Sequence, residues 1–191
     1  MLLLVTNPVD VLTYLANEMY PNKKGKIFGS GTMLDTARFR FHLAEELKVN
    51  PHSVHTYILG EHGDNSFPVY ENALIGGQRL MDFDGVNDDL IKKAFDKTRE
   101  AAYRIIEAKG ATYYAIGVVV SKVMSSIESN ARTVYPVSVV LNNYQGYSGV
   151  ALSLPCVVGA NGIERVLEVD LSNKEKEDLK KAVEALLEYC K

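Results

Sequence analysis

The hydrophobic pattern of the chain starts at its first residues, where an aliphatic run, 2–5, is followed by a polar turn and a proline. A short continuous apolar run bounded by turn residues is typical of a buried strand. Pro8 stands where proline is favoured, at the start of a helix that we expect to reach residue 20. Because a buried strand normally has neighbours on both sides, the run raises the question of which strands flank it.

Further along, apolar residues recur at helical spacing in some segments, and β-branched and aromatic residues gather between turn residues in others. The expected helices span residues 8–20, 32–48, 87–109 and 112–130, with a last helix beginning at Ser172. The expected strands span residues 2–5, 26–28, 54–59, 67–74, 134–141, 150–158 and 163–169.

Local signals mark the ends of several of these elements. Gly110 stands where a helix C-cap is favoured, and Glu175, three residues after Ser172, predicts a capping box. The β-rich runs 134–141 and 150–158 flank a turn rich in Gly, Asn and Tyr, which is typical of an antiparallel pair. The whole order predicts an α+β domain with antiparallel hairpins, preceded by the end of a parallel β/α unit.

Composition adds limits to this picture. The 191 residues are 47% hydrophobic and 24% charged, with a net charge of -3, so a globular domain is expected and neither nucleic acid nor a membrane surface is indicated as a partner. No apolar run approaches the ~18 residues that a membrane-spanning helix needs, and the opening run is too short for a signal peptide. Cys156 and Cys190 provide no disulfide framework, so we expect a reducing, cytoplasmic location.

The strongest candidate for chemistry is His62, which lies in the polar, glycine-containing stretch 60–64 after an expected strand. An ordinary histidine pKa of about 6.5 suits proton transfer near neutrality. The alternative is a surface histidine beside acidic residues. The other histidines, His42, His52 and His55, form no pair with a metal-ligand spacing, and neither cysteine lies near them in sequence, so no metal site is expected.

A second candidate is the helical segment that contains Asp35, Arg38 and Arg40. At about 100° per residue, Asp35 and Arg38 share one helix face, whereas Arg38 and Arg40 point to nearly opposite sides. The simplest interpretation is a surface ion pair, which contributes little to stability. The functional alternative is that Arg38 binds a carboxylate with both prongs of its guanidinium, while Asp35 orients a histidine.

Two further polar residues stand at places where ligands or caps occur. Asn7 follows the opening strand and precedes a helix, which is a ligand-binding position in α/β proteins, although an Asn-Pro turn or a helix cap explains it equally. Thr112 stands at the start of an expected helix, and a role as its N-cap would be sufficient explanation.

Four segments together resemble a known family. They are VTNPVD at 5–10, GSGTMLDTARFR at 29–40, YILGEHGD at 57–64 and EAKGATYYAIG at 107–117. In order and spacing the chain is similar to the L-lactate dehydrogenase family, and within it to the bacterial, effector-regulated enzymes. The resemblance covers the whole chain. It implies a catalytic, substrate-binding C-terminal domain at residues 31–191, with residues 1–30 as a remnant of the dinucleotide-binding Rossmann domain.

The resemblance implies a role for each matching residue of the substrate site. His62 would accept a proton when lactate is oxidised and donate it when pyruvate is reduced, with Asp35 holding the imidazole. Arg38 would bind the substrate carboxylate through two hydrogen bonds. Asn7 would lie at the nicotinamide and substrate end of the cleft, and Thr112 would line the substrate pocket.

The resemblance also implies a cofactor, an effector and an assembly. Val5 and Ser30 match positions that contact the nicotinamide of NAD, as Asn7 does. Arg40 and His55 match positions that bind fructose 1,6-bisphosphate in allosteric bacterial relatives. The resemblance implies a homo-oligomer, with a homotetramer as the expected form. Malate dehydrogenases share the central site residues, but Glu61 before the histidine and the run KGATYYAIG favour lactate as the substrate.

The glycine-rich phosphate-binding turn of a Rossmann domain, GxGxxG, is missing from the sequence. The nearest stretch, Gly29-Ser30-Gly31, lacks the third glycine. We therefore expect that most of the NAD-binding domain, and the loop that covers the substrate, are absent from this chain. Two hypotheses follow. The chain is either the catalytic half of an enzyme that needs its missing half, or an inactive module for subunit association or effector binding.

Overall fold

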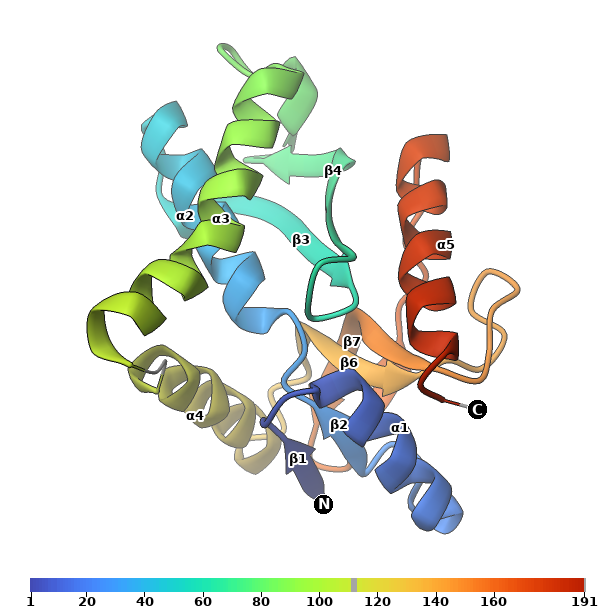
Figure 1. Cartoon of the computed structure of the whole chain (residues 1–191). Helices are drawn as coiled ribbons and strands as arrows, with labels where there is room; N and C mark the ends of the chain where they lie inside the picture. The colour runs from blue at the N-terminus through green and yellow to red at the C-terminus, as the bar shows by residue number, and fades with distance from the viewer. Residues whose placement is uncertain (111–112, 191) are drawn as a thin grey trace.

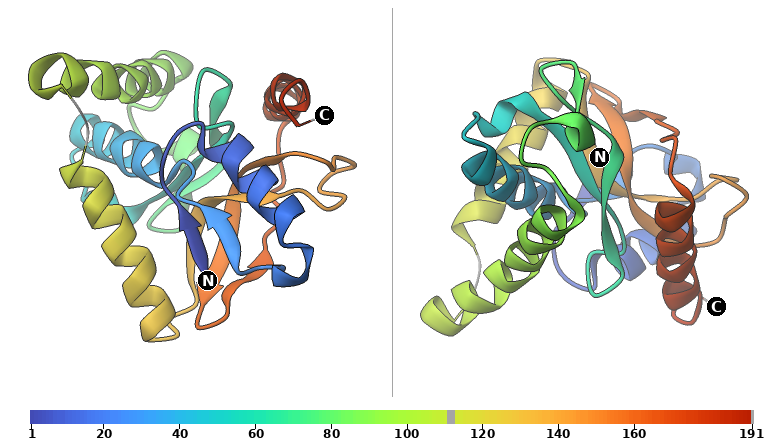
Figure 2. Two further views of the ribbon diagram at one scale, coloured as in Figure 1. Left: turned by 60° about the horizontal axis from the view of Figure 1, so that its bottom comes forward. Right: turned by 90° about the horizontal axis from the view of Figure 1, so that it is seen from above.

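The computed structural model describes residues 1–110 and 113–190, which form one mixed sheet with helices on both of its faces (Figures 1 and 2). The strands are β1 (Leu2–Leu4), β2 (Ile27–Gly29), β3 (Val54–Gly60), β4 (Ser66–Ile75), β5 (Gln78–Arg79), β6 (Thr133–Val140), β7 (Ala151–Gly159) and β8 (Gly162–Val166). The helices are α1 (Val9–Met19), α2 (Met33–Leu47), α3 (Asp88–Lys109), α4 (Tyr114–Glu128) and α5 (Asn173–Leu187).

The sheet runs in the order β1-β2-β6-β7-β3-β4-β5, with β8 added on β7. Among the strands of the described residues, only β1 and β2 pair in parallel, and the other neighbours are antiparallel. The predicted antiparallel pair is confirmed as β6 and β7, in register from Thr133 opposite Val158 to Val140 opposite Ala151. The expected α+β architecture, with a short parallel β/α unit in front, is confirmed.

The opening run forms the predicted strand, but it is not buried as its apolar pattern indicated. β1 pairs only with β2, so it is an edge strand within the described part of the chain. Leu2 is 42% exposed and Val5, just beyond the strand, is 36% exposed. The apolar pattern is typical of a strand inside a parallel sheet whose faces are buried. In the described part of the chain, β1 has one paired strand and its side chains are partly exposed.

Two apolar clusters hold the elements together. The larger one surrounds β6 and β7, where α4 and α5 contribute Val123 and Leu179. The smaller one joins α2, α3, β3 and β4, and in it the ring of Phe39 meets that of Phe95 edge to face at 6.4 Å between centroids. Full burial of a side chain such as Phe39 stabilises the fold by about 1.5–3 kcal/mol. Through this second cluster α2 is seated against β3.

The start of α5 carries the predicted capping box. The Ser172 hydroxyl accepts from the Glu175 N–H at 3.3 Å, and the Glu175 carboxylate accepts from the Ser172 N–H at 2.8 Å. The same carboxylate, only 2% exposed, also accepts from the N–H groups of Tyr70 and Glu71 at 2.9 and 3.3 Å. The cap therefore also ties α5 to β4.

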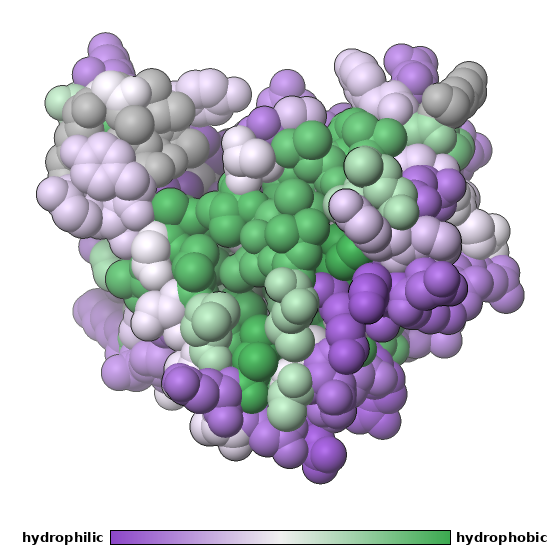
Figure 3. All heavy atoms as spheres, turned by 90° about the horizontal axis from the view of Figure 1, so that it is seen from below, coloured by the Kyte–Doolittle hydropathy of each residue, from purple (hydrophilic) through white to green (hydrophobic). Residues whose placement is uncertain are grey.

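The face seen from below in Figure 1 is apolar over a wide area (Figure 3). On this side β1 lies between α1 and α4 (Figure 2, left). Exposed aliphatic side chains of these elements include Leu2, Leu15 and Val118. No helix in the described part of the chain is long and apolar enough to cross a bilayer.

We expect the isolated chain to self-associate at tens of micromolar, because an unpaired strand edge and an uncovered apolar face both favour association. Sedimentation velocity over a range of concentrations would measure this directly. Val118→Lys, which places a charge on α4 where the side chain is 57% exposed, should weaken association without unfolding the chain. A wild-type chain that sediments as a clean monomer throughout would contradict the expectation.

Candidate active site

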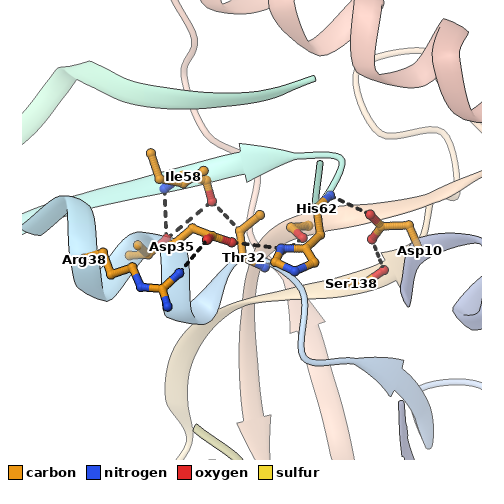
Figure 4. Close-up of polar contacts among 9 residues, drawn as sticks. Asp10, Thr32, Asp35, Arg38, Ile58, His62 and Ser138 are labelled. Atoms are coloured by element: carbon orange, nitrogen blue, oxygen red, sulfur yellow. Dashed lines mark hydrogen bonds and ion pairs between the residues drawn. The ribbon is translucent and has the colours of Figure 1, made fainter. Parts of the chain in front are cut away.

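The centre of the site is a histidine–aspartate couple (Figure 4). Nδ1 of His62, in the loop between β3 and β4, lies 2.8 Å from Oδ2 of Asp35 in the first turn of α2. Both side chains are half-buried, at 29% and 20% exposure. A carboxylate only accepts, so the proton of this hydrogen bond lies on Nδ1 and Nε2 remains for proton exchange.

The loop that carries His62 is shaped by the residues on either side of it. Gly60 has φ +88°, and a Cβ at this position would lie 2.8 Å from the carbonyl oxygen of Asn65, so glycine is required there. The Glu61 carboxylate accepts from the side-chain amide of Asn65 at 2.6 Å and from its backbone N–H at 3.3 Å. These contacts close the loop into a fixed turn.

Two threonine hydroxyls fasten the beginning of α2 to β3. The hydroxyl of Thr32 donates to the Ile58 carbonyl at 2.5 Å, and the hydroxyl of Thr36 accepts from the Ile58 N–H at 2.9 Å. Both threonines are buried. Asp35 stands between them on the same turn, and β3 leads directly to His62. The pair of threonines therefore fixes the distance between the two members of the couple.

A second carboxylate contacts the backbone of the histidine. Oδ2 of Asp10, near the start of α1, accepts from the His62 N–H at 2.6 Å, and Oδ1 accepts from the Ser138 hydroxyl at 2.5 Å. Asp10 is 3% exposed, and burial raises its pKa to about 6 although both hydrogen bonds act in the opposite direction. Sequence reasoning assigned no role to Asp10. Its only signal was its place as the last residue of the segment VTNPVD.

The electrostatic surroundings favour the protonated form of His62. Burial by itself, the largest single effect, lowers the pKa of this imidazole. The hydrogen bond and charge of Asp35, together with the charge of Asp10, outweigh burial and the repulsion from Arg38, so the pKa is raised above its ordinary value. The site thus favours the imidazolium, the form that donates a proton, more than the surroundings of an ordinary histidine do.

Arg38 lies on the opposite side of the Asp35 carboxylate from His62 (Figure 4). Its Nη1 is 3.8 Å from Oδ1 of Asp35, which is a long ion pair rather than a two-pronged grip. Its Nη2 is buried and has no hydrogen-bond partner in the described part of the chain. Burial lowers the pKa of the guanidinium, against the charge of Asp35. A buried donor without a partner has free capacity for an anionic ligand.

An open cleft of about 780 Å³ adjoins the couple. Among the residues that line it are Asn7, Asp35 and His62, whereas Arg38 does not line it. The other walls come from α3, from α5 and from the residues just after α5. Among the side chains there are Thr98, Arg99, Tyr103, Glu184, Glu188 and Tyr189. Arg99 also pairs with Asp64 of the histidine loop at 3.0 Å. Sequence reasoning missed this contribution of α3 and α5, since nothing local marks those residues as near His62.

The remaining predicted site residues are scattered around this centre. Asn7 is exposed on the cleft, and Val5 is exposed two residues earlier. Ser30 is only 3% exposed, and its N–H donates to the Leu4 carbonyl at 2.8 Å, so its side chain is largely closed to a ligand in this chain. Thr112 lies outside the described residues. No cluster of three or more metal-ligating side chains occurs in the described ranges.

Arg40 and His55 lie away from the cleft, on α2 and β3. Nε of Arg40 donates to the Thr56 carbonyl at 2.8 Å, and its guanidinium carbon lies 5.1 Å from the centroid of the Tyr57 ring. Burial lowers the pKa of this guanidinium. His55 is exposed on the strand. Arg40 and Arg38 thus have separate surroundings, in agreement with the helical-wheel prediction.

The fold and this geometry define a class of protein, namely α+β domains in which a hydrogen-bonded histidine–carboxylate couple lies next to an arginine. The sequence profile described as "lactate/malate dehydrogenase, alpha/beta C-terminal domain" matches residues 32–191. The chain therefore belongs to the lactate/malate dehydrogenase family, as the resemblance of its motifs indicated.

Similar proteins support this assignment. The L-lactate dehydrogenases of Macrococcus caseolyticus and Salinibacter ruber are 44% and 42% identical to this chain, over 96% and 97% of its length. Crystal structures of a minor L-lactate dehydrogenase from Enterococcus mundtii and of a lactate dehydrogenase from a deep-sea metagenome library superpose with TM-scores of 0.93 and 0.94, at 34% identity, over 98% and 99% of the chain. The chain spans about 60% of the length of each of these proteins, from 59% to 62%.

Asp35→Asn is expected to lower the pKa of His62, because the amide keeps a hydrogen-bond partner but lacks the charge that favours imidazolium. The stabilisation by this couple is fully present below the unfolded histidine pKa of about 6.5 and is lost as pH rises through the raised folded pKa. Wild type should therefore lose more stability than Asp35→Asn between about pH 6 and pH 8.

Two measurements check this expectation, NMR titration of the His62 ring and urea denaturation at several pH values. Glu45→Gln is the matched control, since Glu45 pairs with another histidine of α2, His42, at 3.9 Å. That variant should leave the His62 titration unchanged. A folded Asp35→Asn chain whose His62 titrates as in wild type would contradict the role of Asp35.

Proposed function

We propose that this chain is the substrate-binding, acid–base half of an NAD-dependent L-lactate dehydrogenase, which interconverts L-lactate and pyruvate. The observation that carries the proposal is the His62–Asp35 couple with the buried, partly unpartnered guanidinium of Arg38 beside it. A 2-hydroxy acid needs a group that exchanges the hydroxyl proton and a cation that holds the carboxylate. The couple and Arg38 supply these two groups.

His62 acts as the proton-transfer group in both directions. In pyruvate reduction the imidazolium donates its Nε2 proton to the carbonyl oxygen, and in lactate oxidation the neutral ring accepts the hydroxyl proton. Asp35 keeps the ring oriented and favours the charged form. The charge of the imidazolium also polarises the carbonyl, which assists attack at the carbonyl carbon.

Arg38 is proposed to anchor the substrate carboxylate. Its Nη2 has no partner in the described part of the chain, and Asp35 engages Nη1 only at 3.8 Å. A planar guanidinium can meet a carboxylate with two parallel hydrogen bonds, which fixes the orientation of the substrate as well as its position. The carboxylate would then lie next to Asp35, within reach of the histidine on its other side.

NAD, when bound, supplies the hydride acceptor or donor of the reaction. The residues proposed for it here, Val5, Asn7 and Ser30, would touch only the nicotinamide end, and Ser30 is nearly closed. The dinucleotide-binding domain could pack on the apolar face formed by β1, α1 and α4 (Figure 3). It could also pair with the edge of β1 that has no partner in the described residues. We propose that this domain must be supplied from outside residues 1–191 for turnover.

Several finer assignments are also proposals, and they rest on the similar proteins and on the motif positions that this chain shares with the family. Lactate is preferred to malate because the relatives described above are lactate dehydrogenases. Residues 1–30 are proposed as a part of the dinucleotide-binding domain, and the protein as a cytoplasmic homo-oligomer. Arg40 and His55 are proposed to hold fructose 1,6-bisphosphate, and Thr112 to line the substrate pocket. The alternative function is an inactive module for subunit association.

The chain alone should neither bind NADH with micromolar affinity nor reduce pyruvate. It should gain pyruvate reduction when co-expressed with the N-terminal part of the Macrococcus caseolyticus enzyme that lies outside the match. Fluorescence titration and NADH absorbance measure the two properties. Faster turnover of oxaloacetate than of pyruvate would assign the chain to malate instead. A stable complex with no turnover of either substrate would favour the association module.

Arg38→Lys should reduce kcat/KM for pyruvate in the reconstituted enzyme by more than tenfold, about 1.4 kcal/mol or more. A lysine ammonium is a point charge and cannot reproduce the two parallel hydrogen bonds. Arg40→Lys is the matched control on the same helix and should leave this value nearly unchanged without effector. A loss of less than tenfold in Arg38→Lys would mean that Arg38 is not the carboxylate anchor.

A further inference from the structure

We propose that Asp10 is a second positioning residue for His62, which holds the main chain of the histidine and adds a negative charge that keeps the ring protonated. This inference rests on the proposed acid–base role of His62. It differs from the role of Asp35, because Asp10 contacts the backbone of the histidine and belongs to a different helix (Figure 4).

Both oxygens of the Asp10 carboxylate are occupied, and they join three distant segments. Oδ2 accepts from the His62 N–H at 2.6 Å, across 52 positions in the sequence. Oδ1 accepts from the Ser138 hydroxyl on β6 at 2.5 Å, across 128 positions. Asp10 therefore locks the histidine loop and the sheet to the start of α1. Asn7, three residues earlier, lines the cleft, so the same contact also fixes that wall relative to His62.

Asp10 is 3% exposed, and burying a charged carboxylate costs more free energy than burying a neutral group that accepts or donates the same hydrogen bonds. An asparagine could accept from the His62 N–H and donate to Ser138, because a hydroxyl both donates and accepts. The hydrogen bonds alone therefore do not require a carboxylate at this position. What a carboxylate adds is negative charge next to His62, and this charge raises the pKa of the imidazole.

Asp10 itself is expected to change charge in the range where His62 works. Burial raises its pKa to about 6, close to the ordinary histidine value of about 6.5. Two interacting groups with similar pKa values titrate as a coupled pair, and each reports the charge of the other. A chain in which Asp10 acts through charge should therefore show an inflection near pH 6 in the His62 signal, in addition to the protonation of the ring itself.

Other charged and titratable groups also face His62 and have to be held constant in the test. Asp35 and Arg38 on α2 act on it directly. The remaining groups lie on the walls of the cleft, at Glu61, Asp64, Arg99, Tyr103, Glu184, Glu188 and Tyr189. None of them is altered by a substitution at Asp10, so a change in the His62 titration in such a variant reports the contribution of Asp10.

The experiment is an NMR titration of the His62 ring in the 191-residue chain, with its signal assigned by His62→Gln. Asp10→Asn should lower the pKa of His62 by roughly half a unit or more, as expected for removal of a nearby opposite charge. Glu45→Gln, which removes a carboxylate charge beside His42 and leaves Asp10 intact, is the matched control and should not move the His62 pKa. A folded Asp10→Asn chain with an unchanged His62 pKa would overturn the proposal and leave Asp10 a scaffold residue.

A second measurement needs no substitution at Asp10 and covers the case in which Asp10→Asn fails to fold. The Asp10 carboxyl carbon of the wild-type chain, labelled with ¹³C, should titrate near pH 6, and the His62 signal should show a matching inflection. A carboxyl that stays protonated over the whole pH range in which His62 loses its proton would carry no charge to act on the ring, and would overturn the proposal. Both measurements are independent of turnover, so they remain decisive even when the reconstituted enzyme shows no lactate dehydrogenase activity.

Discussion

The attachment of α2 to β3 by the hydroxyls of Thr32 and Thr36 is the constraint on which the site depends. Both bond to the backbone of Ile58, one to its carbonyl and one to its N–H. In a buried place each of these polar groups would be costly without a partner. The helix and the strand therefore cannot slide past one another without losing these bonds, and the distance from Asp35 to His62 is set by that requirement.

The charges in the site are arranged around one titrating group. His62 lies between Asp35 at its ring and Asp10 at its backbone, while Arg38 lies beyond Asp35. Desolvation favours the neutral imidazole, and the two carboxylates together reverse that preference. Asp35 lies 3.8 Å from Nη1 of Arg38, and Nη2 has no hydrogen-bond partner in the described part of the chain. One carboxylate thus serves both the acid–base group and the proposed substrate anchor, which explains their closeness.

The site lies beside a well-buried sheet core, whereas the β1 end of the sheet is exposed in the described part of the chain. β6 and β7 are buried in the middle of the sheet, whereas β1 has a single partner and an apolar face beside it (Figure 3). The family relationship and the coverage of the relatives, about 60% of their length, fit this division. The couple is held by α2, by the loop that follows β3 and by Asp10 of α1, all of which lie within residues 1–191. A dinucleotide needs a larger surface, of which only the nicotinamide end is proposed to lie here.

The sequence by itself determined the five helices and all strands but β5, the capping box at Ser172 and the candidate site residues Asp35, Arg38 and His62. Helical and strand periodicities are local, and the family motifs are short contiguous segments, so both can be found without coordinates. Only the tertiary structure decided that β2 is the one strand paired with β1 in the described part of the chain, and that α3 and α5 line the cleft. The tertiary structure alone showed that Asp10 contacts the backbone of His62. Contacts between residues 52 or 128 positions apart produce no periodic pattern that could be recognised in the sequence.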